Sequence, residues 1–331
     1  MSFTILGTGS ALPSLCKTND DLSKIMDTSD EWIRARTGIE QRYLCGAESI
    51  TDLACLAAEE ALRDAGIAAA DLDLILCATA TTDYLLPSMA CLVQERIGAQ
   101  CAAFDINAAC SGFLYALDIA AGYYARKNVK HVLVIGAEAL SRIVDWTDRR
   151  TAVIFADGAG AAVLGEGNDL LASYIGAHGN HKVLYAENVK GNCPFRTESS
   201  EDGAECGGQY IQMDGQEVFR FASASMVRDL KRIMKEAELT PQDVSYVLPH
   251  QANRRIIDFA ISKIPDIPPE RFLVNIDKRG NTSAASIPVL LDEYNKKGTF
   301  HKGDILLFTV FGAGLTTAAC ALRWSGEQYN K

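Results

Sequence analysis

The apolar segment at residues 108–125 constrains the fold of this chain most strongly, because its only strongly polar side chains are Ser111 and Asp118. If the segment is helical, it is apolar nearly all round, which is typical of a helix buried in the middle of a large domain. Cys110 stands at its start, where unpaired backbone N–H groups and the helix dipole favour an anion and lower the pKa of a thiol. Cys110 is therefore a candidate nucleophile. The alternative is a small core residue, since free cysteine is among the most buried residue types.

Helical and strand-like segments alternate on both sides of this stretch. Residues 51–65 have the periodicity of a helix, and Gly66 follows as a stop signal. Residues 71–80 form a continuous apolar run, which is typical of a strand buried on both faces. In all, we expect helices over 20–35, 51–65 and 88–97, and strands over 3–7, 71–80 and 131–137. This alternation predicts α/β architecture with parallel strands.

A Gly-Ala-Gly motif between two apolar runs occurs twice, in residues 151–164 and 305–322, and we interpret each as a turn between two strands. The second copy has a similar context, with helices expected over 216–237, 253–263 and 283–297 and strands over 244–250 and 271–276. We therefore expect two similar halves, 1–170 and 171–331, each with a mixed sheet covered by helices. Residues 176–212 between them are rich in Gly, Asn, Ser and acidic residues, which predicts a long surface excursion of the kind that serves as a binding loop or lid.

Composition excludes several classes of function. The chain has 32 basic and 42 acidic residues in 331, a net charge of −10, which argues against nucleic acid as a partner. Any acidic partner must be met by a local basic patch. The ten cysteines never form C-x-x-C, which argues against a zinc site or redox pair and predicts reduced thiols. With neither a basic, apolar leader nor about 18 consecutive apolar residues, the chain is expected to be cytoplasmic.

Three polar residues follow predicted strands at matching places in the two halves. Cys110 follows a strand of the first half, Asn281 follows the corresponding strand of the second, and His250 ends the strand over 244–250. Superposing the halves brings these residues to one end of the sheets. Each has an ordinary alternative, because a histidine after a strand is often a satisfied core residue and Gly-Asn is a common turn pair.

The motifs around these residues resemble a known family. The segments DINAACSG around Cys110, PHQANRR from Pro249 and GNTSAAS from Gly280 are similar, in the same order, to the active-site motifs of the β-ketoacyl-ACP synthase III family of thiolase-like condensing enzymes. Residues 28–39, 147–164 and 213–222 match further family segments, so the resemblance covers essentially the whole chain. It implies the five-layered αβαβα thiolase fold, a homodimer, and decarboxylative Claisen condensation of a short acyl-CoA primer with malonyl-ACP to initiate fatty acid synthesis.

The resemblance implies a role for each catalytic candidate. Cys110 would carry the acyl group, which suits a thiolate because it attacks thioesters and also leaves as one. His250 and Asn281 would donate N–H groups to the oxygen on which enolate charge develops. Backbone N–H groups of Cys110 and Ala313 would hold the second oxyanion. Ala313 stands where the family commonly has glycine, which puts the geometry of that turn in doubt.

By the same resemblance, Trp32 and Arg149 would sandwich the adenine of coenzyme A, with Arg36 and Thr37 nearby. A flat aromatic ring and a guanidinium are suited to such stacking. The alternative is a surface tryptophan beside a solvated arginine. The resemblance implies no metal and no cofactor, because the coenzyme A thioester is a substrate.

Two further sites concern the partners. Arg220 and Arg255 match positions that receive the acidic carrier protein, and an acidic chain needs such a patch to overcome long-range repulsion. Leu86 matches a position that reaches across the dimer interface to the partner's acyl pocket. That position is phenylalanine in some members that accept only very short primers, so we expect primers longer than acetyl, or branched. The alternative is an interface leucine that has no influence on the primer.

Other functions stay open at this point. Within the superfamily, the Gly280-Asn281-Thr282 motif argues against elongating enzymes with two histidines, and Cys320 lies in an apolar run, unlike the second cysteine of thiolases. Starter-condensing enzymes of polyketide or signal biosynthesis share the Cys-His-Asn set. From other classes, a thioester hydrolase acylated on Cys110 and an inactive acyl-carrier-binding protein are the alternatives.

Overall fold

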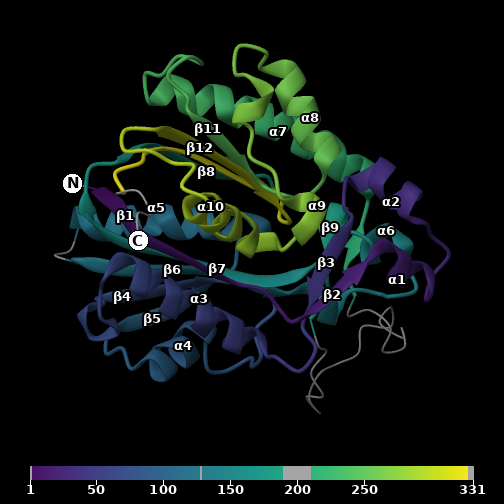
Figure 1. Cartoon of the computed structure of the whole chain (residues 1–331), viewed down its shortest axis with the longest axis horizontal. Helices are drawn as coiled ribbons and strands as arrows, with labels where there is room; N and C mark the ends of the chain where they lie inside the picture. Colours follow the sequence, from purple (N-terminus) through teal and green to yellow (C-terminus); the bar gives the residue numbers. More distant parts are fainter. Residues whose placement is uncertain (1, 127–128, 189–209, 327–331) are drawn as a thin grey trace, which may run out of the picture.

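The structure is a computed structural model that describes residues 2–126, 129–188 and 210–326. Two sheets and three layers of helices are stacked on one another in the order αβαβα (Figure 1). This is the five-layered fold that the resemblance implied.

The first sheet has the strand order β1-β7-β6-β4-β5. Its strands are β1 (Ser2–Ala11), β4 (Leu74–Ala78), β5 (Ala102–Ile106), β6 (His131–Ala139) and β7 (Asp157–Gly167). Strand β4 lies between β6 and β5 and is parallel to both, and all five of its residues are buried, as expected from its continuous apolar run. Strand β7 is antiparallel to both β1 and β6.

The second sheet has the order β11-β12-β13-β8. Its strands are β8 (Leu170–Ala177), β11 (Tyr246–Pro249), β12 (Ile305–Gly312) and β13 (Thr316–Arg323). Only the β11–β12 pair is parallel. Two small ribbons pair β2 (Leu15–Thr18) with β3 (Gln41–Leu44), and β9 (Leu184–Tyr185) with β10 (Gln212–Met213).

Helices α5 (Gly112–Arg126) and α10 (Ser286–Lys296) lie between the two sheets (Figure 1). Phe113 and Leu117 of α5 pack in the same apolar cluster as Leu76 of the first sheet and Phe308 of the second. The expectation of a helix buried in the middle of a large domain is therefore confirmed. Its burial on both sides explains the nearly continuous apolar sequence of this segment.

The outer helices cover the other face of each sheet. Helices α3 (Ile50–Ala65) and α4 (Met89–Ile97) cover the first sheet, and α7 (Gly215–Glu236) and α8 (Arg254–Lys263) cover the second (Figure 1). Short helices α1 (Asn19–Ser23), α2 (Asp30–Thr37), α6 (Arg149–Ala152) and α9 (Ile276–Arg279) complete the described part. The single helix expected over 20–35 is thus wrong: Ser29 accepts a hydrogen bond from the backbone of Trp32 and begins a second helix.

The two Gly-Ala-Gly motifs have different structures. Gly312 and Gly314 lie at the turn between β12 and β13, as expected, whereas Gly158 and Gly160 lie inside β7, so the first turn is wrong. The reason is packing on the face of β7. A Cβ on Gly160 would lie 2.7 Å from the backbone nitrogen of Val289, so the glycine lets α10 approach this strand closely.

The expected strand over 271–276 is also wrong, since these residues make only one isolated bridge, from Phe272 to Val247, before α9 begins. Most of the predicted excursion, residues 189–209, lies outside the described residues. The division of the chain into halves at residue 170 stays a proposal. Within the described ranges, no helix combines the length and apolar character needed to cross a bilayer. A cytoplasmic location stays a prediction.

Candidate active site

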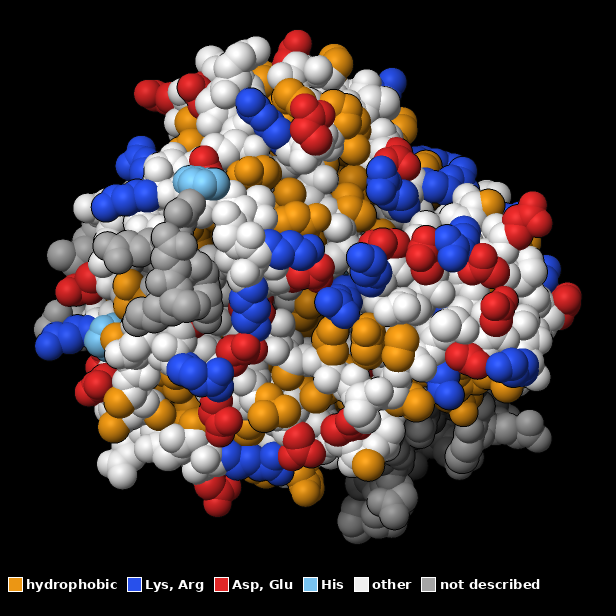
Figure 2. Space-filling view, viewed as in Figure 1, with side chains coloured by type: hydrophobic (Ala, Val, Ile, Leu, Met, Phe, Trp, Pro, Cys, Tyr) orange, Lys and Arg blue, Asp and Glu red, His pale blue; other side chains and the backbone are white. Residues whose placement is uncertain are grey.

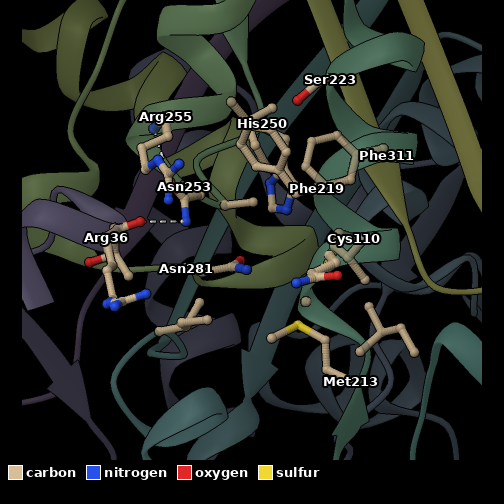
Figure 3. Close-up of a pocket in the computed structure, with 18 of the residues that line it drawn as sticks. Arg36, Cys110, Met213, Phe219, Ser223, His250, Asn253, Arg255, Asn281 and Phe311 are labelled. Atoms are coloured by element: carbon tan, nitrogen blue, oxygen red, sulfur yellow. Dashed lines mark hydrogen bonds between the residues drawn. The ribbon is translucent and has the colours of Figure 1, made fainter.

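A cavity of about 910 Å³ is lined by the end of β12 in the second sheet, by helices α2, α7 and α8, and by connecting segments. It contains Cys110, His250 and Asn281, the three catalytic candidates. Figure 3 shows these residues around a common space, with Arg36 and Arg255 on its opposite side. His250 is 1 % exposed and Asn281 5 % exposed, so these two polar side chains are held deep in the protein.

Cys110 lies in a single 3-10 turn (Ala109–Ser111) that leads directly into α5. The turn between β12 and β13 approaches it closely, because a Cβ on Gly312 would lie 2.8 Å from the Cys110 backbone nitrogen. Burial raises the pKa of the Cys110 thiol to about 12, and the nearby Glu138 carboxylate adds to this, whereas a hydrogen bond with Ser283 lowers it. The net direction is opposite to the lowering that we expected from the helix N-terminus.

His250 directly follows β11, where its backbone N–H donates to the carbonyl oxygen of Thr309 at 2.8 Å. Its Nδ1 lies 3.0 Å from the Ser286 hydroxyl oxygen, which also accepts the backbone N–H of Gln251 at 2.9 Å. Nε2 is buried and has no hydrogen-bond partner among the described residues. Burial lowers the pKa of His250 to about 3, so the imidazole is neutral at neutral pH.

Asn281 is fixed through both its backbone and its side chain. Its backbone N–H donates to Ile154 at 3.0 Å and its carbonyl accepts from Ala156 at 2.9 Å, which ties it to the segment before β7. Its side-chain Oδ1 accepts the backbone N–H of Ser283 at 2.9 Å. This hydrogen bond leaves the Nδ2 amino group as the part of the amide that is available to the cavity.

Ala313 lies in the turn after β12, next to Gly312, which lines the cavity. Its φ is not in the left-handed region, in contrast to the value of 131° at Gly314. An alanine is therefore accommodated without backbone strain where the family commonly has glycine. Its expected role as a backbone donor stays a prediction.

The residues expected to bind coenzyme A lie together at the other end of the cavity. Trp32, Arg36 and Thr37 line it. The guanidinium carbons of Arg36 and Arg149 lie 4.7 and 4.9 Å from the centre of the Trp32 ring. Arg149 itself is not among the lining residues, whereas Arg150 is, and our sequence reasoning missed it. The adjacent arginines at 149 and 150 were the signal that could have identified it.

Arg220 and Arg255 also line this cavity, from α7 and α8. Arg220 is 73 % exposed and pairs with Glu217 at 2.8 Å. Figure 2 shows lysine and arginine side chains interspersed with acidic ones over the viewed face.

Sequence reasoning also missed Asn253, whose side chain donates to the Arg36 carbonyl at 3.0 Å and so joins α8 to α2 (Figure 3).

Leu86 does not line the cavity of its own chain. It is 83 % exposed and belongs to an exposed apolar run with Tyr84 and Leu85, which are 58 % and 87 % exposed. The predicted contact of Leu86 with a partner's acyl pocket therefore depends on dimer formation and stays a prediction.

Comparison with known proteins agrees with the resemblance. Two family models match: 3-oxoacyl-[acyl-carrier-protein (ACP)] synthase III at residues 104–179 and its C-terminal part at residues 234–324. The chain is 47 % identical over 329 residues to the β-ketoacyl-[acyl-carrier-protein] synthase III of Aquifex aeolicus, covering 98 % of this chain and 100 % of that protein. The crystal structure of the Aquifex aeolicus 3-oxoacyl-[acyl-carrier-protein] synthase III has a TM-score of 0.89 and covers 97 % of this chain and 100 % of that one.

Two other solved structures are similar over almost the whole chain. The β-ketoacyl-[acyl carrier protein] synthase III of Thermus thermophilus is 42 % identical, with a TM-score of 0.90 and coverage of 98 % of this chain and 100 % of that one. The priming β-ketosynthase of the R1128 polyketide pathway is 32 % identical, with a TM-score of 0.90 and coverage of 98 % and 96 %.

Proposed function

The chain belongs to the β-ketoacyl-ACP synthase III family, and we propose that Cys110, His250 and Asn281 carry out this family's reaction. The enzyme is an acyltransferase that initiates fatty acid synthesis by condensation. The observation that carries the assignment of residues is the single cavity in which the thiol of Cys110 faces an unpartnered imidazole nitrogen and a free amide nitrogen of the described chain.

In the first half-reaction, the sulfur of Cys110 attacks the carbonyl carbon of an acyl-CoA. The bond from that carbon to the coenzyme A sulfur breaks, and the thiol proton passes to the leaving sulfur. Because burial raises the pKa of Cys110 to about 12, the thiol is protonated in the free enzyme and has to lose its proton as the thioester binds. The backbone N–H groups of Cys110 and Ala313 hold the oxyanion of this step, and they hold the second oxyanion that forms when the enolate later attacks acyl-Cys110.

In the second half-reaction, malonyl-ACP loses carbon dioxide, and the electron pair of the broken bond forms an enolate. The Ser286 oxygen already accepts one backbone N–H, so its hydroxyl proton is available to donate to Nδ1 of His250. The imidazole proton then resides on Nε2, which donates to the enolate oxygen together with Nδ2 of Asn281. The enolate carbon attacks acyl-Cys110, and the sulfur leaves and takes up a proton.

Coenzyme A enters past Trp32. An adenine that stacks between the Trp32 ring and a guanidinium needs about 7 Å between these two groups, which is twice the contact distance of stacked planar groups. Arg149 lies at 4.9 Å, so it has to swing outward when adenine binds. This movement breaks its hydrogen bond to the Asp27 backbone carbonyl at 2.6 Å and its ion pair with the exposed Asp27 carboxylate at 3.3 Å.

Arg220 and Arg255 receive the acidic carrier protein at the cavity entrance, where both side chains are exposed enough to meet a partner. The enzyme acts as a homodimer, and the exposed run at Tyr84, Leu85 and Leu86 supports a partner surface there. Leu86 lies in the acyl pocket of the partner subunit in this arrangement.

One assay tests the reaction. The enzyme is incubated with an acyl-CoA and malonyl-ACP, and the release of coenzyme A and carbon dioxide is followed while the protein is analysed by intact mass. We expect equal amounts of both products and an acyl adduct on Cys110. Carboxylic acid without carbon dioxide would indicate a hydrolase, and neither product would indicate a binding protein.

A further inference from the structure

We propose that Glu138 and Ser283 are positioning residues that hold the Asn281 amide with its Nδ2 toward the substrate. The inference rests on the proposed role of Asn281 as a donor to the enolate. Neither residue belongs to the predicted catalytic set, and the two come from segments 145 residues apart.

Ser283 determines which way the Asn281 amide faces. Its backbone N–H donates to Asn281 Oδ1 at 2.9 Å, and an N–H can be satisfied only by the oxygen of that amide. A flipped amide would break this hydrogen bond and turn an oxygen toward the enolate oxygen, where it would repel rather than stabilise. The single bond from Ser283 therefore selects the productive orientation.

Ser283 makes this hydrogen bond from an unfavourable backbone conformation, which contacts with other residues have to stabilise. Its φ is 51°, in the left-handed region that residues other than glycine rarely adopt. The Ser283 hydroxyl donates to Oε1 of Glu138 at 3.1 Å, which provides an anchor for the strained residue. The turn at Ser283–Ala285 also packs against the turn at Ala109–Ser111 that carries Cys110, so Ser283 lies close to both Asn281 and the nucleophile.

Glu138 is itself held rigidly. It is fully buried near the end of β6, and its Oε2 accepts from the Thr81 hydroxyl at 2.6 Å and from the backbone of Ala80 at 3.1 Å. Strand β6 approaches the Ser283 segment closely, since a Cβ on Gly136 would lie 2.3 Å from the carbonyl oxygen of Ala284.

A carboxyl group in this place carries a cost. Burial raises the pKa of Glu138 to about 7, which means that its charged form is disfavoured there. An apolar side chain would avoid that penalty. A costly buried acid whose hydrogen bonds lead to a catalytic amide is expected where positioning matters more than stability.

The test measures malonyl-ACP decarboxylation without primer. Glu138→Ala and Ser283→Ala should lower its kcat about 10- to 100-fold, the range typical of a misplaced catalytic group, with KM for malonyl-ACP nearly unchanged. Glu138→Gln keeps the shape and a hydrogen bond to Ser283, so it should restore most of the activity. Ser283→Ala removes a single hydroxyl and provides the same test if Glu138→Ala does not fold.

Two controls separate positioning from general stability. Asp292→Ala removes another fully buried carboxylate, one that accepts from Thr8 at 2.8 Å and Ser10 at 2.5 Å instead of from the Ser283 segment. It should lower the unfolding temperature and leave decarboxylation per folded molecule unchanged. In an Asn281→Ala background, Glu138→Ala should cause no further loss, because the group through which it acts is gone.

The outcomes that overturn the inference differ from those that overturn the proposed function. Normal decarboxylation by Glu138→Ala and Ser283→Ala alongside a defective Asn281→Ala, or fully additive losses in the double variant, would overturn the positioning role alone. Normal decarboxylation by Asn281→Ala would contradict the proposed role of Asn281 and this inference with it.

Discussion

At the scale of single residues, His250 shows how burial prepares a side chain for its task. A neutral imidazole whose Nδ1 is occupied by Ser286 presents one N–H to the cavity, and burial lowers its pKa to about 3. It therefore stays uncharged over the whole neutral range. A protonated, cationic imidazole would instead attract the malonyl carboxylate, which has to leave as carbon dioxide.

The same burial links the stability of the protein to pH. The unfolded histidine takes up a proton as pH falls below about 6.5, whereas the native His250 stays neutral until about pH 3, so stability is lost on acidification. Between pH 7 and pH 5 the wild type should lose about 2 kcal/mol more than His250→Ala. Urea unfolding at a fixed protein concentration measures both. Equal pH dependence in the two proteins would show that the native imidazole titrates normally.

The two half-reactions should depend on different residues. Cys110→Ala should abolish acyl transfer from acyl-CoA, because no nucleophile remains, and leave some malonyl decarboxylation. His250→Ala and Asn281→Ala should do the reverse, since each loses a donor worth on the order of 100- to 1,000-fold in rate. Intact mass measures the first half-reaction and carbon dioxide release the second.

Cys320→Ala is the matched control for the nucleophile, because Cys320 is a free cysteine buried on β13 within the apolar core and away from the cavity. It should be acylated on Cys110 like the wild type. Normal decarboxylation by His250→Ala would show that the imidazole is not the donor that we assign.

At the scale of elements, α7 and α8 carry the arginines that we assign to the carrier protein. Arg220→Glu and Arg255→Glu should weaken the use of malonyl-ACP and spare acylation by acyl-CoA. The on-rate of the wild type for the carrier should fall with salt, because exposed charges are screened within about 8 Å at physiological ionic strength. Stopped-flow binding over a salt series measures it.

Lys263→Glu makes the same change of charge at the other end of α8 and does not touch the cavity. It should leave carrier binding close to that of the wild type. Equal damage to both half-reactions by the arginine variants would assign these residues to coenzyme A or to the fold instead.

At the scale of the whole molecule, the choice of primer depends on a partner subunit. Leu86→Phe should shift preference toward acetyl without changing decarboxylation, because the ring fills space that additional methylenes occupy in the wild type. Each methylene buried is worth about 0.8 kcal/mol, or roughly a fourfold preference. Competition among acetyl-, butyryl- and isobutyryl-CoA for Cys110 measures the shift.

Leu85→Phe is the control for this change, since Leu85 is the exposed neighbour of Leu86. It should not alter the product ratios. Unchanged ratios in Leu86→Phe would remove this residue from the account of selectivity, and equal shifts in both variants would indicate a general effect on the interface.

Several parts of this protein follow from local patterns in the amino-acid sequence. The apolar run after Cys110 predicted the buried helix α5, and the periodicity of residues 51–65, with Gly66 after them, predicted α3. Three motifs in order predicted the family. Each of these predictions used residues close together in the sequence, because periodicity, caps and motifs are local properties.

Other features depend on contacts between residues far apart in the chain, and local pattern did not predict them. Gly158 and Gly160 read as a turn, but β7 continues through them because α10 packs on its face. The pKa of Cys110 is raised although a helix begins beside it, since burial is a property of the whole fold. The hydrogen bond from Ser283 to Glu138 joins residues 145 positions apart in the chain, so no local sequence pattern predicts it.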